Sequence, residues 1–141
     1  MDKLFLNKIL MKTALQKKIF IVDDDPFWNI RMTLMLNNLG YTNVVSFESG
    51  EDCINNLHLK PGIIFLDYQM KAMDGLEVLR RAKDYFNDID IVFCTANENM
   101  GVAINAMKSG SFDFLIKHKT TEEQLGSILE NMCLEYAGKI Y

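Results

Sequence analysis

The chain has 141 residues, of which 49% are apolar and 24% are charged. This composition is typical of one globular domain and excludes a disordered chain. The net charge of −4 argues against a nucleic-acid-binding surface, which is normally basic. No apolar run is long enough to span a membrane, and three widely spaced cysteines fit neither a disulfide framework nor a zinc site. We therefore expect a cytoplasmic protein that binds neither membranes nor nucleic acid directly.

The first residues differ in charge from the rest of the chain. Residues 1–18 carry five lysines and one aspartate, whereas the remainder is acidic. We predict that residues 1–17 are an N-terminal extension and that residues 18–141 form the domain. The extension is interpreted as a frayed segment, or as sequence upstream of a native start at Met11; a basic membrane-surface or partner helix is the alternative.

Short apolar runs alternate with helical segments five times along the chain. The runs fall at 19–22, 44–47, 62–67, 91–94 and 112–116. Capping residues precede the helical segments, among them Asp25, Ser49, Asp74 and either Thr120 or Thr121. Strict alternation of strand and helix produces a parallel sheet with helices on both faces. We predict an α/β fold of the flavodoxin-like (βα)5 type, a three-layer sandwich with strand order 2-1-3-4-5.

Apolar spacing also predicts which side of a helix faces the core. In the first helix after Pro26, one stripe is formed by Phe27, Ile30 and Leu34, and it is widened by Met32, Met35, Leu36 and Leu39. In the helix that ends before Gly110, the spacing i, i+3, i+4, i+7 is met by Met100, Ala103, Ile104 and Met107. Both sets are expected to be buried.

Polar side chains lie at the ends of four predicted strands. Asp23 and Asp24 follow the first strand, Asp67 ends the third, and Thr95 and Lys117 follow the fourth and fifth. The first and third strands are neighbours in this strand order, so the three carboxylates converge. Each pair would repel by roughly 4 kcal/mol at ~4 Å. A divalent cation relieves this repulsion, and a set of oxygen ligands alone selects Mg²⁺.

A metal-bound carboxylate that faces a lysine and a hydroxyl suits phosphoryl transfer. Asp67 can act as the nucleophile and form an aspartyl phosphate. The cation and the ammonium of Lys117 would neutralise charge on the phosphoryl group. The hydroxyl of Thr95 can then hydrogen-bond to a phosphoryl oxygen.

From about Lys18 onwards the chain resembles the receiver domain of two-component response regulators of the chemotaxis-regulator type. The resemblance rests on four segments in the right order: FIVDDDP at 20–26, FLDYQM at 65–70 followed by MDG at 73–75, TA at 95–96 and DFLIK at 113–117. By this resemblance, Asp67 is the phosphoacceptor, Thr95 the switch hydroxyl and Lys117 the phosphoryl-binding lysine. Phe114 stands where the family has its rotating aromatic side chain.

The resemblance also implies a metal site and two positions that tune rate. Asp24 would bind Mg²⁺ directly and Asp23 chiefly through water. Asp67 would bind it as well, and Gln69 would contribute its backbone carbonyl. The side chains of Gln69 and Asn97 occupy the two variable positions that influence dephosphorylation in the family.

Two loop positions depart from the family pattern. The proline that usually follows the lysine, commonly in a cis bond, is His118, and the usual Pro-Gly in the loop after the acceptor is Lys71-Ala72. A non-proline cis bond costs ~3–4 kcal/mol. We therefore expect either a trans Lys117–His118 bond or a strained loop.

The expected function is a phosphorelay switch. A histidine kinase or phosphotransfer protein would phosphorylate Asp67, and the domain would change its affinity for a downstream effector or for an output domain of a larger regulator. The readout surface would be formed by the fourth helix, fifth strand and fifth helix of the (βα)5 fold, which is also the surface for a possible homodimer. The domain would catalyse only its own phosphorylation and dephosphorylation.

Two alternatives remain open from the residues. An aspartate-nucleophile phosphohydrolase would carry a second acid two residues after the nucleophile, where this chain has Gln69. A pseudo-receiver would be a protein-interaction module that is not phosphorylated. The substitutions at His118 and Lys71 keep the pseudo-receiver open.

Overall fold

A computed structural model describes residues 2–140 of the chain. Its parallel sheet has the strand order β2-β1-β3-β4-β5. The strands are β1 (Ile19–Val22), β2 (Val44–Phe47), β3 (Ile63–Asp67), β4 (Asp90–Thr95) and β5 (Asp113–Ile116). The helices are α1 (Lys3–Leu15), α2 (Pro26–Asn38), α3 (Gly50–Asn55), α4 (Gly75–Tyr85), α5 (Met100–Lys108) and α6 (Glu122–Ile140), with short 3-10 helices η1 (Leu57–Leu59) and η2 (Lys117–Lys119).

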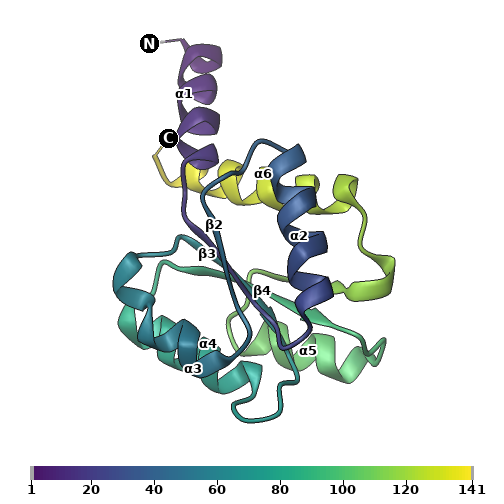
Figure 1. Cartoon of the computed structure of the whole chain (residues 1–141). Helices are drawn as coiled ribbons and strands as arrows, with labels where there is room; N and C mark the ends of the chain where they lie inside the picture. Colours follow the sequence, from purple (N-terminus) through teal and green to yellow (C-terminus); the bar gives the residue numbers. More distant parts are fainter. Residues whose placement is uncertain (1, 141) are drawn as a thin grey trace.

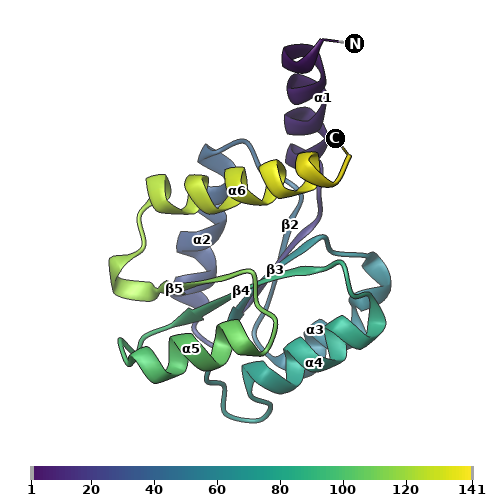
Figure 2. The same ribbon diagram turned by 180° about the vertical axis from the view of Figure 1, so that it is seen from behind.

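Helices cover both faces of the sheet (Figures 1 and 2). α2 and α6 lie on one face, and α3, α4 and α5 lie on the other. The predicted fold, a three-layer flavodoxin-like (βα)5 sandwich with order 2-1-3-4-5, is therefore confirmed.

The strands differ in burial according to their place in the sheet. Every residue of β1 and β3 is buried, because both strands are central and have helices above and below them. The edge strands β2 and β5 are mostly half-buried. In the parallel register Val22 pairs with Leu66, and Asp67 pairs with Cys94. The segments that follow β1, β3 and β4 therefore leave the sheet at the same end.

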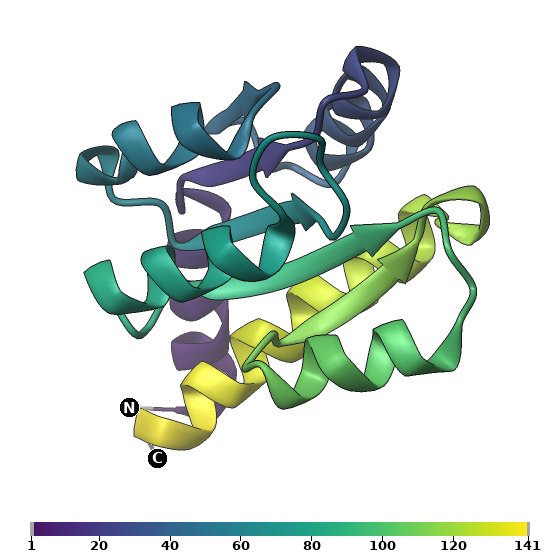
Figure 3. The same ribbon diagram turned by 90° about the horizontal axis from the view of Figure 1, so that it is seen from below.

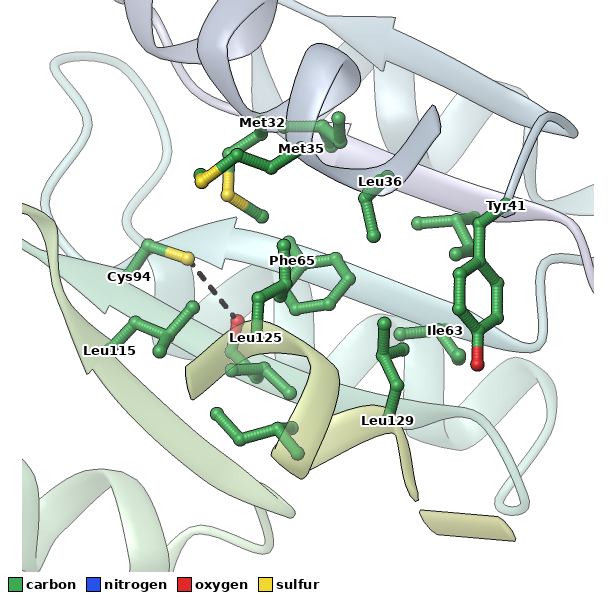
Figure 4. Packing of buried hydrophobic residues seen from close by; sticks show 14 of the residues in the cluster. Met32, Met35, Leu36, Tyr41, Ile63, Phe65, Cys94, Leu115, Leu125 and Leu129 are labelled. Carbon is green, nitrogen blue, oxygen red and sulfur yellow. Dashed lines mark hydrogen bonds between the residues drawn. The ribbon is translucent and has the colours of Figure 1, made fainter. Parts of the chain in front are cut away.

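Two hydrophobic clusters fill the space between the sheet and its helices. Figure 4 shows the cluster beneath α2 and α6, where sheet and helix side chains meet, among them Phe65, Cys94, Met32, Leu36, Leu125 and Leu129. The cluster on the other face includes Phe20, Ile64 and Phe93 from the sheet, and Val78 and Ala82 from α4. Burial in these clusters raises the pKa of the Cys53 thiol to about 12 and also raises that of Cys94.

The core-facing side of α2 differs from the prediction. The side chains of Phe27, Ile30 and Leu34 are 80%, 58% and 59% exposed, so the prediction that this stripe is buried is wrong. Met32, Met35 and Leu36 are buried as predicted, and Trp28, which was not predicted, is buried beside them. Apolar residues lie almost all round this helix, so their spacing alone cannot select a face. Packing against the sheet and α6 makes the selection.

The prediction for α5 is correct in one position and wrong in two. Ala103 is buried as expected, whereas Ile104 and Met107 are 49% and 46% exposed. The second buried residue of this helix is Ala106. Two alanines allow α5 to approach the sheet closely, and the larger side chains are left on the outer side. The side chain of Met100 lies outside the described part.

The segment before β1 is a helix, so the prediction of a frayed extension is wrong. The carboxylate of Asp2 caps α1 by accepting a 2.7 Å hydrogen bond from the backbone N–H of Leu4. Leu10 is buried where α1 meets α6, and Figure 1 shows α1 standing out beyond the sandwich near the end of α6. The division of the chain at residue 17 stays a prediction.

Among residues 2–140, no helix is both long enough and apolar enough to cross a membrane.

The predicted helix caps are confirmed. A side-chain oxygen accepts a hydrogen bond from a backbone N–H in the first turn of the following helix at Asp25, Ser49 and Asp74. Of the two candidate threonines before α6, Thr121 is the cap, because its hydroxyl accepts a bond from Gln124. The hydroxyl of Thr120 donates to the carbonyl of Ile116 instead.

Candidate functional site

The three predicted carboxylates meet at one end of the sheet. Asp23, Asp24 and Asp67 each place a carboxylate oxygen within 4.8 Å of the other two. Asp23 is fully buried, Asp67 is 6% exposed and Asp24 is exposed. Figure 3 shows the loop between β3 and α4, in teal, beside the end of β1 where α2 begins. Adjacent central strands thus bring together acids that are far apart in the sequence.

Burial and mutual repulsion change the acidity of the two inner carboxyls. Burial, and then the negative charge of Asp23, raise the pKa of Asp67 to about 7, although Lys117 opposes the shift. The pKa of Asp23 is also raised, chiefly by burial. The cluster therefore favours binding a positive charge, either a proton or a cation.

Lys117 supplies one positive charge to this cluster. Its Nζ lies 2.5 Å from Oδ2 of Asp23 and 3.7 Å from Oδ2 of Asp67. Burial alone would lower the pKa of Lys117, but its hydrogen bond to Asp23 and the charges of both acids raise the pKa above its ordinary value. The lysine therefore stays positively charged beside two buried carboxylates.

Thr95 ends β4 next to the strand that carries Lys117. Its side chain is 4% exposed, and its Oγ1 accepts a 3.0 Å hydrogen bond from the backbone N–H of Asn97. Thr95 pairs with Ile116 in the sheet, so Lys117 follows directly beside it. The hydroxyl thus holds the start of the β4–α5 loop, and the side chain of Asn97 lies exposed on that loop.

The other predicted site residues lie around this group. The backbone N–H of Gln69 donates a 3.3 Å hydrogen bond to Oδ1 of Asp67, and the Gln69 side chain is exposed. Phe114 is half-buried on β5 and packs against the cluster beneath α3, α4 and α5. The structure therefore brings the acids and Lys117 into contact, whereas Phe114 packs in that hydrophobic cluster.

The donor atoms of the acid cluster fit a hard divalent cation. The candidate donors are the oxygens of three carboxylates, and neither imidazole nor thiolate belongs to the cluster. Among the described residues, Oδ2 of Asp23 has no partner except the Lys117 ammonium. A buried carboxylate oxygen with free lone pairs matches the ligand that Mg²⁺ prefers.

Two further residues shape the site and were not predicted from the sequence. The Nδ2 of buried Asn29 donates a 2.9 Å hydrogen bond to the carbonyl oxygen of Asp23, which fixes the end of β1. At Gly75 a Cβ would overlap the carbonyl oxygen of Asp67 and lie 2.9 Å from Cε1 of Phe93. A polar residue on the apolar face of a helix is the one sequence signal that points to Asn29.

The turn after Lys117 is built without proline. The described residues contain no cis peptide, so the Lys117–His118 bond is trans, one of the two outcomes expected. His118 is exposed, and its Nε2 lies 2.6 Å from Oε1 of Glu98. Lys119 Nζ lies 3.2 Å from the same oxygen. Hydrogen bonds from Lys119 and then His118 lower the pKa of Glu98, so the turn is tied to the β4–α5 loop.

Comparison with known proteins places the chain in a family. The family model of the response regulator receiver domain matches residues 19–129. The response regulator protein TodT of Pseudomonas putida is 32% identical over 111 residues, which cover 78% of this chain and 48% of TodT. The chain thus spans about half the length of this relative. The chemotaxis protein CheY of Listeria monocytogenes is 30% identical over 101 residues, which cover 71% of this chain and 85% of CheY.

Solved structures agree on the fold. A BeF3-activated DrrB receiver domain superposes with a TM-score of 0.75 at 23% identity, covering 83% of this chain and 97% of that one. A response regulator receiver domain protein from Clostridium thermocellum gives a TM-score of 0.77 at 22% identity, covering 86% and 97%. Together with the match to the family model, these similarities identify the chain as a response regulator receiver domain of two-component systems.

Proposed function

We propose that the domain is a signalling switch that accepts a phosphoryl group on Asp67. The observation that carries the proposal is the convergence of three carboxylates with the ammonium of Lys117 at one end of the sheet. Such a group is costly to bury for structural reasons alone.

In the transfer step, a carboxylate oxygen of Asp67 attacks the phosphorus of a phosphohistidine or of a small acyl phosphate. The new oxygen–phosphorus bond forms as the bond to the imidazole nitrogen, or to the acyl oxygen, breaks. The leaving group departs with the electron pair of that bond. Lys117 neutralises charge on the phosphoryl oxygens, and the hydroxyl of Thr95 donates a hydrogen bond to one of them.

The proposed cation is Mg²⁺, which typifies the family. Asp24 would hold it directly and Asp23 chiefly through water, with Asp67 and the backbone carbonyl of Gln69 as further ligands. When bound, the cation supplies positive charge to the transferring phosphoryl group. Asp23 keeps the end of β1 in place through Asn29, so the two metal-binding acids sit on a fixed strand end.

Phosphorylation would be read at the surface of α5, β5 and α6, which correspond to the fourth helix, fifth strand and fifth helix of the (βα)5 fold. The exposed side chains of Ile104 and Met107 on α5 support a protein-binding surface there. A histidine kinase or phosphotransfer protein would supply the phosphate. The effector would be a separate protein or an output domain, as in full-length regulators, and a homodimer through this surface remains an alternative. Catalysis would be limited to the domain's own phosphorylation and dephosphorylation, at rates tuned by Gln69 and Asn97.

Intact-mass spectrometry after incubation with Mg²⁺ and acetyl phosphate tests the proposal. We expect one phosphoryl group on the wild type and none on Asp67→Asn. Asp90→Asn is the matched control, because Asp90 is half-buried at the opposite end of β4 and should leave labelling unchanged. An unlabelled wild type would contradict the proposal and would favour a pseudo-receiver.

A further inference from the structure

An arginine on α2 holds both ends of the turn that follows Lys117. Nη1 of Arg31 donates a 3.2 Å hydrogen bond to the carbonyl oxygen of Lys117, and Nη2 donates a 2.6 Å bond to that of Thr120. Lys117 is the first residue of η2, and Thr120 is its C-cap. A guanidinium presents its N–H donors in a rigid planar fork, which suits two acceptors held at fixed positions better than the ammonium of a flexible lysine does.

The same helix also contacts the Lys117 side chain. The Nζ of Lys117 lies 5.6 Å from the ring centroid of Trp28, and Cζ of Arg31 lies 5.6 Å from the same centroid. Trp28 is buried in the cluster beneath α2 and α6, so its ring is a fixed surface. α2 therefore restrains Lys117 twice, through the backbone carbonyl and through the ammonium.

The turn needs this restraint because it lacks the rigidity that proline gives. The Lys117–His118 bond is trans, and His118 and Lys119 are tied to a neighbouring loop through an exposed pair with Glu98. Exposed ion pairs contribute little to order. Arg31 reaches carbonyls instead, and one of its bonds is short and partly buried.

We propose that Arg31 is a positioning residue for phosphoryl transfer: by fixing the turn, it keeps the Lys117 ammonium at the acid cluster. The proposal rests on the proposed function of Asp67. Among the described residues, the hydrogen bonds of Arg31 go to the carbonyls of Lys117 and Thr120 and not to Asp67 or the metal-binding acids, so its effect passes through Lys117. Its loss should slow phosphorylation even at saturating Mg²⁺, where a change in Mg²⁺ affinity cannot account for the slower rate.

The experiment compares Arg31→Met and Arg31→Lys with wild type. Initial rates of labelling by acetyl phosphate are measured at saturating Mg²⁺, and Mg²⁺ affinity is measured by calorimetry. We expect Arg31→Met to slow labelling roughly tenfold, as a small misplacement of a catalytic group does. Arg31→Lys should recover only part of the rate. Arg80→Met is the control, because Arg80 is an exposed arginine on α4 whose partners are Glu77 and Asp84.

A double-mutant cycle separates positioning from stability. In a Lys117→Met background, Arg31→Met should slow labelling no further, because the residue through which it acts is gone. Equal slowing in both backgrounds, or a wild-type rate for Arg31→Met, would overturn the proposal.

A second readout does not depend on phosphorylation. The ε-methylene protons of Lys117 lie near the Trp28 ring and should carry a ring-current shift in the NMR spectrum. At temperatures well below the unfolding transition, we expect Arg31→Met to change the chemical shift of this signal. Arg80→Met should leave the chemical shift unchanged. If the wild type is not labelled, the proposed function fails. The Lys117 signal still tests whether Arg31 positions the Lys117 ammonium. An unmoved Lys117 signal would refute the role of Arg31.

Discussion

The Nζ of Lys117 lies closer to Asp23 than to Asp67, at 2.5 Å against 3.7 Å from the nearest carboxylate oxygen of each. The lysine is therefore the counter-ion of Asp23, a proposed metal-binding acid. A lysine has a flexible stem and three donors, so under the proposed function its ammonium would turn toward a phosphoryl group on Asp67.

Removing this lysine should destabilise the metal-free protein. Lys117→Met leaves the fully buried Asp23 without its cation, and a broken buried pair costs about 3 kcal/mol. Urea unfolding at pH 8 with a chelator measures the loss, and added Mg²⁺ should restore most of it. Lys119→Met is the control, because Lys119 is exposed and, among residues 2–140, its ion-pair partner is Glu98. Equal stability of the two variants would contradict the proposed role of Lys117 as counter-ion.

Stability without metal should fall as the pH rises toward neutrality. The pKa of Asp67 in the folded protein is about 7, against an ordinary value of 3.8. The folded state thus holds this proton more tightly than the unfolded chain, so the stabilisation is complete below pH 4 and is lost as the pH approaches 7. We expect the free energy of unfolding to drop by about 2 kcal/mol between pH 5 and pH 7.

Urea unfolding at several pH values with a chelator checks this dependence. Asp67→Asn should remove most of the slope, and the raised pKa values of Asp23 and Asp90, both chiefly due to burial, should account for the remainder. Asp88→Asn, at an exposed position, should keep the wild-type slope. A slope that survives in Asp67→Asn would assign the proton to another group.

Gly75→Ala should disturb the loop that carries the site. The added methyl would overlap the carbonyl oxygen of Asp67 and lie 3.0 Å from Cα of Tyr68. Backbone atoms cannot yield as side chains do, so we expect a loss of about 1–3 kcal/mol together with slower labelling of Asp67. Gly138→Ala on α6 meets no atom within 4 Å and should change stability by at most about 1 kcal/mol in the favourable direction. Thermal unfolding of both variants decides the matter.

Two substitutions on α2 test which face of the helix is buried. Met32→Ala removes a fully buried side chain and should cost about 2–5 kcal/mol. Leu34→Ala removes one that is 59% exposed and should cost less than about 0.5 kcal/mol. Chemical denaturation gives both values. The reverse order of the two losses would indicate that the predicted stripe of Phe27, Ile30 and Leu34 faces the core.

The sheet could be predicted because its signals are local. A strand that is buried on both faces is a continuous apolar run, and β1 has the predicted limits while β3 differs by one residue. Helix caps such as Asp25 and Asp74 are equally local. The convergence of Asp23 and Asp67 followed from strand order, whereas the roles of Gln69, Asn97 and Phe114 came from family resemblance alone.

Contacts that depend on packing could not be predicted. The apolar residues that surround α2 gave no preferred face until the sheet and α6 were in place. Arg31 binds backbone carbonyls. Because every residue has a backbone carbonyl, the amino-acid sequence does not indicate which ones an arginine will bind. The preference of Lys117 for Asp23 is a matter of about one ångström between two acids of the same type, which side-chain identity cannot specify.

Strand order also divides the site into two parts of unequal resistance to opening. Asp23 follows β1 and Asp67 ends β3, and both strands lie inside the sheet, whereas Lys117 follows β5, which has a neighbour on one side only. Amide hydrogens of an edge strand exchange through smaller openings than those of central strands. Fraying of β5 would therefore withdraw the lysine while the acid pair stays assembled, and hydrogen exchange should show β5 opening at lower free energy than β1 and β3.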